Sequence, residues 1–127
     1  MKIITRLSVL VAVAGLSALA STASAQRISP MTAGNFGRIC TSRGGAQICD
    51  AYITGMADAG ALSKINAANN GDASAQAGFC IPQSTTGTDL RSKVVSWLKG
   101  HKDELSKPVG ETVFVALHES YPCGTGK

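Results

Sequence analysis

The chain contains 127 residues, of which 44% are hydrophobic and 16% charged, and it has a formal net charge of +4 at pH 7. This length is sufficient for one domain with one hydrophobic core and leaves no room for two. The basic residues are scattered along the sequence, as on an ordinary solvated surface, so the positive charge does not indicate a nucleic-acid partner.

Residues 1–25 have the organisation of a secretory signal peptide. Two basic residues precede an uncharged apolar run over residues 7–19, and the small residues 23–25 follow it. The apolar run is short for a membrane anchor, and the cleavage site follows it directly. We therefore expect export to the periplasm, cleavage before Gln26, and a product of residues 26–127 that is free of the membrane.

Four cysteines follow the predicted cleavage point, at Cys40, Cys49, Cys80 and Cys123. An exported chain of this size with an even number of cysteines is typical of a domain stabilised by two disulfides, for which three pairings are possible. The intervals between the cysteines contain no CxxC pair, which argues against a zinc site. Oxidised thiols and a total of only two histidines argue against a cysteine nucleophile. We expect a protein that is not an enzyme and holds no metal or cofactor.

Two helices are predicted in the first half of the domain. Residues 31–40 place apolar side chains at loosely helical spacing, and residues 47–68 form a longer amphipathic pattern. The apolar face of the longer helix contains Ile48, Tyr52, Met56, Ala59, Leu62 and Ile65. Gly55 and Gly60 lie within this helix, where each costs about 1 kcal/mol relative to alanine. Either another backbone packs closely against these glycines or they are tolerated on the surface.

A polar loop, residues 69–78, separates the first two helices from the rest of the domain. Thr86, with Asp89 three residues later, resembles a capping box. This pattern predicts a third helix over residues 89–101 that ends near Gly100.

A fourth helix is predicted over residues 109–121, after the connection at residues 102–106. Ser106 is its expected cap, and Pro108 is expected in the first turn, where a missing N–H costs nothing. Residues 112–117 also suit a buried strand, because they include β-branched and aromatic side chains. The length of the segment and its sustained helical period favour the helix.

These elements predict an all-α domain of four helices packed as two antiparallel hairpins. In the first hairpin the end of one helix meets the start of the next, which pairs Cys40 with Cys49. In the second, the segment entering the third helix lies beside the end of the fourth, which pairs Cys80 with Cys123. In the chain-entropy description, the short loop contributes about 2.7 kcal/mol of stability and the long loop about 4 kcal/mol.

Several short stretches resemble, by their order and spacing, the Rap/Tai family of type VI secretion immunity proteins. They are CDAYITGMADA at residues 49–59, FCIP at 79–82, VVSWLKGH at 94–101, ETVFVAL at 111–117 and YPC at 121–123. The resemblance covers nearly the whole domain, from about Gly34 to Cys123. It implies a small helical periplasmic protein, commonly a homodimer, that binds and blocks a peptidoglycan amidase delivered by neighbouring cells. Many members have proline directly after the histidine of GH, where this chain has Lys102.

Recognition by such an inhibitor is expected in the connections, because the apolar faces of the helices are used by the core. Two connections have suitable polar side chains. The loop after the second helix contains Asn69, Asn70 and Asp72. The turn before the fourth helix contains His101, Lys102, Asp103 and Glu104. We favour the charged turn, because a segment held between two helices loses less entropy on binding.

The alternative function is a general periplasmic binding module or stress chaperone, which would hold unfolded clients through exposed apolar surface. The family motifs and the disulfide-stabilised helical core favour the immunity protein.

Overall fold

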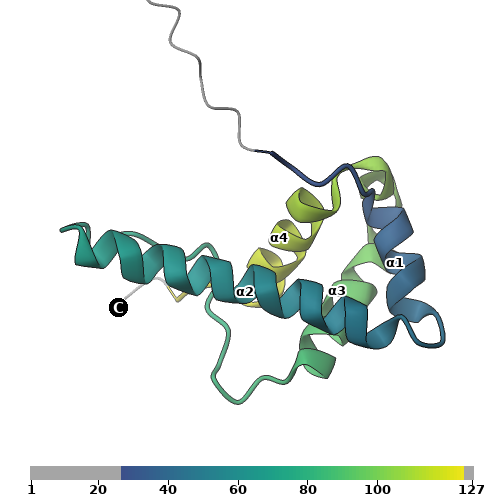
Figure 1. Cartoon of the computed structure of the whole chain (residues 1–127), viewed down its shortest axis with the longest axis horizontal. Coiled ribbons are helices and arrows are strands. Elements are labelled where there is room, and N and C mark those ends of the chain that lie inside the picture. Colours follow the sequence, from purple (N-terminus) through teal and green to yellow (C-terminus); the bar gives the residue numbers. More distant parts are fainter. Residues whose placement is uncertain (1–26, 125–127) are drawn as a thin grey trace, which may run out of the picture.

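The computed structural model describes residues 27–124. The predicted signal peptide and its cleavage site lie outside the described residues. The described part folds into α1 (Ala33–Thr41), α2 (Ala46–Asn69), α3 (Gly87–Gly100), the short 3-10 helix η1 (Lys102–Ser106) and α4 (Val109–Ser120) (Figure 1). The prediction of an all-α domain with four helices is confirmed. The connection predicted before the fourth helix is itself helical.

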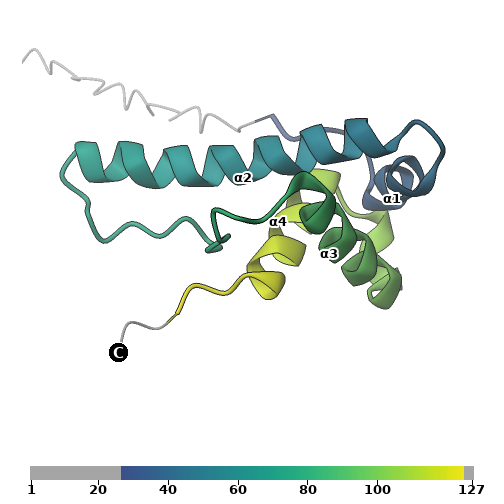
Figure 2. The same cartoon turned by 90° about the horizontal axis from the view of Figure 1, so that it is seen from below.

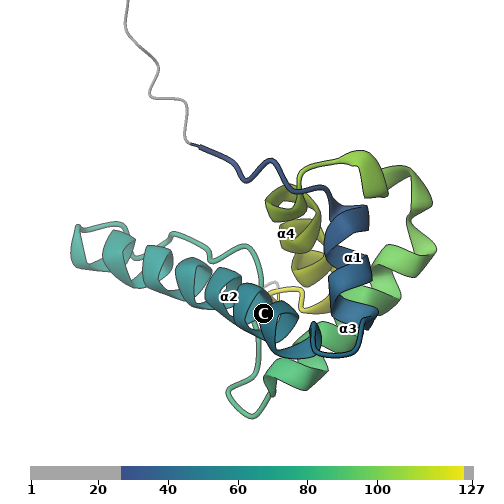
Figure 3. The ribbon, with the colours of Figure 1, turned by 45° about the vertical axis from the view of Figure 1, so that its right-hand side comes forward.

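The longest helix, α2, lies across the others. Figure 2 shows α3 and α4 on one side of it, with α1 at its N-terminal end. α3 and α4 run in opposite directions and are joined through η1 (Figure 3). The first half of α2 packs on this layer, whereas its second half extends beyond it beside the loop that returns to α3 (Figures 1 and 2).

The hydrophobic core receives side chains from all four α-helices. Its largest fully buried side chains include Phe36, Ile53, Val94, Val109, Val113 and Leu117. Each such side chain contributes roughly 1.5–3 kcal/mol through removal of apolar surface from water. Residues 112–117 are helical and bury one stripe of α4, so the strand alternative for this segment is wrong.

The start of α3 has the predicted capping box. The backbone N–H of Asp89 donates to Thr86 Oγ1 at 3.2 Å, while the Thr86 hydroxyl and N–H donate to Asp89 Oδ2 at 2.7 and 3.0 Å. These hydrogen bonds lower the pKa of the Asp89 carboxyl, since they favour its charged form.

The start of α4 is organised differently from the prediction, because Ser106 belongs to η1 and does not cap the helix. The N-cap position is Pro108, which makes no side-chain cap. The backbone replaces it: the Val109 N–H donates to the Met31 carbonyl at 2.8 Å, and the Ala33 N–H donates to the Lys107 carbonyl at 2.9 Å. This antiparallel bridge fixes the starts of α1 and α4 to each other.

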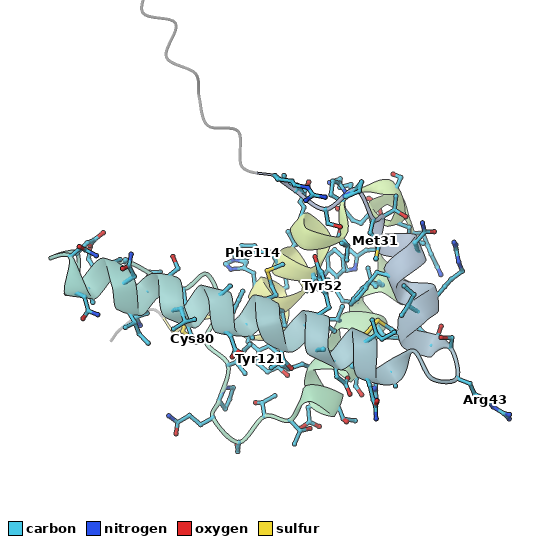
Figure 4. The ribbon with its side chains drawn as sticks, in the orientation of Figure 1. Met31, Arg43, Tyr52, Cys80, Phe114 and Tyr121 are labelled. Carbon is cyan, nitrogen blue, oxygen red and sulfur yellow. A yellow bond between two sulfur atoms is a disulfide. The ribbon has the colours of Figure 1, made fainter. Side chains whose placement is uncertain are left out.

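Both predicted disulfides are confirmed. Cys40–Cys49 joins the end of α1 to the start of α2 and is buried, whereas Cys80–Cys123 joins the loop before α3 to the segment after α4. The Cys80 N–H also donates to the Tyr121 carbonyl at 2.8 Å, and Figure 4 shows the two residues on the same flank of α2. The two ends of the second hairpin are therefore held together by a covalent bond and a backbone hydrogen bond.

The prediction for the apolar face of α2 is wrong in part. Tyr52 and Met56 pack against the core, but Ile48, Leu62 and Ile65 are 63%, 63% and 55% exposed. The 24 residues of α2 span about 36 Å, against about 21 Å for the 14 residues of α3. A helix of this length extends past its neighbours, so Leu62 and Ile65 in its outer half have no core to cover them. Ile48 lies in the first turn of α2, where the adjacent Cys49 is the buried residue.

Candidate partner-binding surfaces

The predicted charged turn is a tip built on the end of α3. The His101 N–H donates to the Trp97 carbonyl at 3.1 Å, and His101 Nδ1 lies 2.8 Å from the same oxygen. The imidazole stacks on the Trp97 indole with ring centroids 3.8 Å apart. The Trp97 Nε1–H in turn donates to Glu119 Oε2 of α4 at 2.6 Å. His101 therefore supports the tip, which the indole connects to α4.

Only part of the charge at the tip is free for a partner. Lys102 and Asp103 are exposed, whereas Glu104 is half-buried and lies 2.9 Å from Lys107 Nζ. The hydrogen bond to Glu104, supported by the charge of Glu111 at 3.8 Å, raises the pKa of Lys107 above its ordinary value. The Glu104–Lys107 pair thus braces η1, and the exposed ionic groups are those of Lys102 and Asp103.

The second predicted surface is the far end of α2. Asn69 is the last residue of the helix, and Asn70 caps it by donating from Nδ2 to the Asn66 carbonyl at 2.7 Å. Asp72 Oδ1 accepts hydrogen bonds from the N–H and the hydroxyl of Ser74 at 3.1 and 2.7 Å. The Asn70 amide and this Asp72 oxygen therefore stabilise the turn, although all three predicted side chains are exposed.

The structure does not bring the two predicted surfaces together. The end of α2 and the tip at η1 lie at opposite ends of the molecule (Figures 1 and 3). A single compact partner loop cannot contact both, so they are separate candidates.

An apolar surface on the outer half of α2 was not predicted from the sequence. Leu62 and Ile65 are one helical turn apart and exposed, and Phe114 of α4 is 41% exposed. Open grooves of about 360 and 580 Å³ follow α2 where the returning loop packs against it, and Phe79 of that loop lines both. The predicted length of the second helix is about twice that of a typical helix, and this length indicated that part of the helix would extend beyond the core.

The described residues include no group of three or more His, Cys, Asp or Glu side chains placed to hold a metal ion. Between residues 27 and 124, no helix has the length and apolar character needed to cross a membrane.

The fold and these surfaces define a small, disulfide-stabilised helical protein whose candidate sites are surfaces for another protein. The chain belongs to the Rap1a immunity protein family, whose model matches residues 32–123. The match begins at Thr32, the N-cap of α1, and ends at Cys123, so it covers the whole helical domain and both disulfides. Comparison with curated proteins and with solved structures finds no match.

Proposed function

We propose that this protein acts in the periplasm as an immunity protein, which binds and inhibits a peptidoglycan amidase delivered by a type VI secretion system. The membership of residues 32–123 in the immunity family carries the proposal. Two disulfides and the signal-like N-terminal sequence suit an oxidising compartment outside the cytoplasm. Family membership also favours immunity over a general chaperone.

In this proposal the tip at η1 occupies or borders the substrate cleft of the amidase and excludes peptidoglycan without undergoing a reaction. The tip is preorganised, because His101 is stacked on Trp97 and Glu104 is paired with Lys107. A preorganised segment binds with a smaller loss of conformational entropy than a free loop does. The exposed Lys102 and Asp103 side chains supply its polar contacts.

The test measures inhibition of the amidase encoded beside this protein. The double variant Lys102→Ala/Asp103→Ala removes the exposed charges of the tip, leaves the net charge unchanged and keeps the Glu104–Lys107 pair. We expect the concentration for half-inhibition to rise about tenfold or more, as for truncation of central interface residues. The matched control is Asn69→Ala/Asp72→Ala at the far end of α2, which should inhibit like the wild type.

Two outcomes would contradict these proposals separately. Full inhibition by the tip variant would show that the binding surface lies elsewhere. It would lie at the end of α2 if the Asn69→Ala/Asp72→Ala variant loses inhibition instead. Absence of inhibition by the folded wild-type protein would contradict the proposed function itself.

We also propose that the protein forms a homodimer through the outer half of α2. Leu62, Ile65 and Phe114 are exposed large apolar side chains in a small domain, and the grooves beside α2 are open. Neighbouring exposed apolar side chains such as Leu62 and Ile65, one helical turn apart, mark protein interfaces. A second copy of the same helix would cover these two side chains and leave the tip at η1 accessible to the amidase.

A further inference from the structure

A third concave surface lies between α1 and α3, away from the outer half of α2. It is an open cleft of about 200 Å³ whose lining includes Gly37 and Arg38 of α1, Val95, Leu98 and Lys99 of α3, and Lys102 of η1. Its apolar lining includes Val95 and Leu98, and Leu98 lies next to the space that the glycine leaves. A methyl group at position 37 would lie 3.5 Å from Leu98 Cδ1, so the missing side chain gives the cleft part of its depth.

The rim of the cleft is basic. Arg38, Lys99 and Lys102 are all exposed, and the ion pairs found between residues 27 and 124 involve Arg91 and Lys107 instead. The carboxylates nearest to the rim along the chain are those of Asp103, which is exposed, and Glu104, which is held by Lys107. Three exposed cations therefore line the cleft together with its apolar side chains.

We propose that this cleft binds an acidic segment of the partner protein, one apolar side chain of which enters between α1 and α3 while flanking carboxylates pair with the basic rim. The volume of about 200 Å³ is below the roughly 300–1,000 Å³ of small-molecule sites and suits a single side chain. Charge complementarity selects an acidic partner over a basic one. The inference depends on the proposed function only for the identity of the partner, which is the toxin.

The first test uses a defined probe and does not require the toxin. The probe is the peptide acetyl-Asp-Glu-Leu-Glu-Asp-amide, titrated into ¹⁵N-labelled protein at low salt. We expect saturable shifts of the amides of Gly37, Lys99 and Lys102, with a dissociation constant on the order of 1 mM, because one side chain and a few exposed ion pairs drive binding. Peptides with lysine in place of the acids, or serine in place of leucine, should bind at least about fivefold more weakly.

Two variants locate the binding in the cleft. Gly37→Ala fills its floor at an ordinary contact distance and also removes a glycine from a helix, so the protein should stay folded while the affinity for the peptide falls about fivefold or more. Its matched control is Gly55→Ala on α2, where no other described part of the domain lies within 4 Å of the added methyl group and the affinity should not change. The charge reversal Lys99→Glu should abolish binding, whereas Lys93→Glu, outside the cleft on the same helix, should leave most of it.

The inference is overturned if the shifts lie elsewhere, if the serine or lysine peptide binds as well as the probe, or if both glycine variants behave alike. It is also overturned if Lys99→Glu disrupts the homodimer, since the occupant is then a second copy. In the amidase assay, full inhibition by Lys99→Glu contradicts the cleft as a toxin site and leaves the proposed function intact. If the wild type does not inhibit, the proposed function is wrong, and the peptide titration alone then tests whether the cleft binds an acidic segment.

Discussion

At the residue scale, Thr86 and Asp89 form the capping box at the start of α3. Four successive N–H groups at a helix start have no partner within the helix, and this pair satisfies two of the local donors with three hydrogen bonds. The ionised Asp89 carboxylate also interacts favourably with the positive end of the helix dipole. The pKa of this carboxyl is therefore lower in the folded protein than in the unfolded chain.

Removal of the cap should produce a defined loss of stability. Thr86→Ala should lower the free energy of unfolding by about 1 kcal/mol near neutral pH, measured by urea denaturation. A carboxyl with a lowered folded pKa stabilises above its unfolded pKa, about 3.9, and loses this contribution as pH falls through the folded value. The difference between wild type and variant should therefore be constant near neutral pH and shrink as the pH falls below about 4.

The matched control for this cap is Ser92→Ala, an exposed hydroxyl in the middle of the same helix. It should leave the stability unchanged or slightly higher at every pH, because alanine is the better helix former. If the free energy of unfolding of the wild type and of Thr86→Ala changed in parallel with pH, the cap would not depend on the ionisation of Asp89, and this prediction would be wrong.

At the element scale, the two glycines within α2 have opposite surroundings. A Cβ atom at Gly60 would lie 2.8 Å from Phe79 Cζ and 3.3 Å from the Ala77 carbonyl oxygen, whereas one at Gly55 would have no described atom within 4 Å apart from its own helix backbone and chain neighbours. Phe79 is buried, and its ring packs against Phe114 with centroids 5.5 Å apart, so it cannot move away easily. Gly60 is thus required where the returning loop crosses α2.

This contrast predicts opposite effects of one substitution on one helix. Gly55→Ala should raise the free energy of unfolding by up to about 1 kcal/mol, through helix propensity alone. Gly60→Ala should lower it by about 1 kcal/mol, since overpacking against Phe79 exceeds the same propensity gain. Chemical denaturation of both variants measures the difference. Equal stabilisation by the two would mean that the loop does not pack against α2.

At the scale of the whole molecule, the outer half of α2 determines the expected assembly. Light scattering should report a homodimer at micromolar concentration. The double variant Leu62→Glu/Ile65→Glu should be a folded monomer, because charges in the centre of an apolar interface have no partners when they are buried. Ile48→Glu is the matched control, since Ile48 is as exposed as Leu62 but lies at the other end of α2. A wild-type monomer, or a dimer that survives the double variant, would contradict this interface.

Most local features of the fold were predictable from the sequence, because they depend on residues close together in the chain. The helical periods and the capping box at Thr86 were read from spacing alone, and the limits of the four α-helices agree with the structure to within two residues. The exceptions are the helical turn η1 and the start of α4, where Ser106 does not cap the helix. The pairing of Cys40 with Cys49 and of Cys80 with Cys123 followed from hairpin adjacency. The family motifs extend over the same residues that the family model matches.

Only the tertiary structure decided which faces these helices use. Periodicity gives an apolar stripe on α2 but not the length of the layer beneath it, so Leu62 and Ile65 were assigned to a core that ends before it reaches them. It likewise cannot place Arg38 of α1 beside Lys99 and Lys102, because that cleft depends on the packing of α1 against α3 and η1. Local spacing determined the elements of this protein, and long-range packing determined the surfaces that remain for its partners.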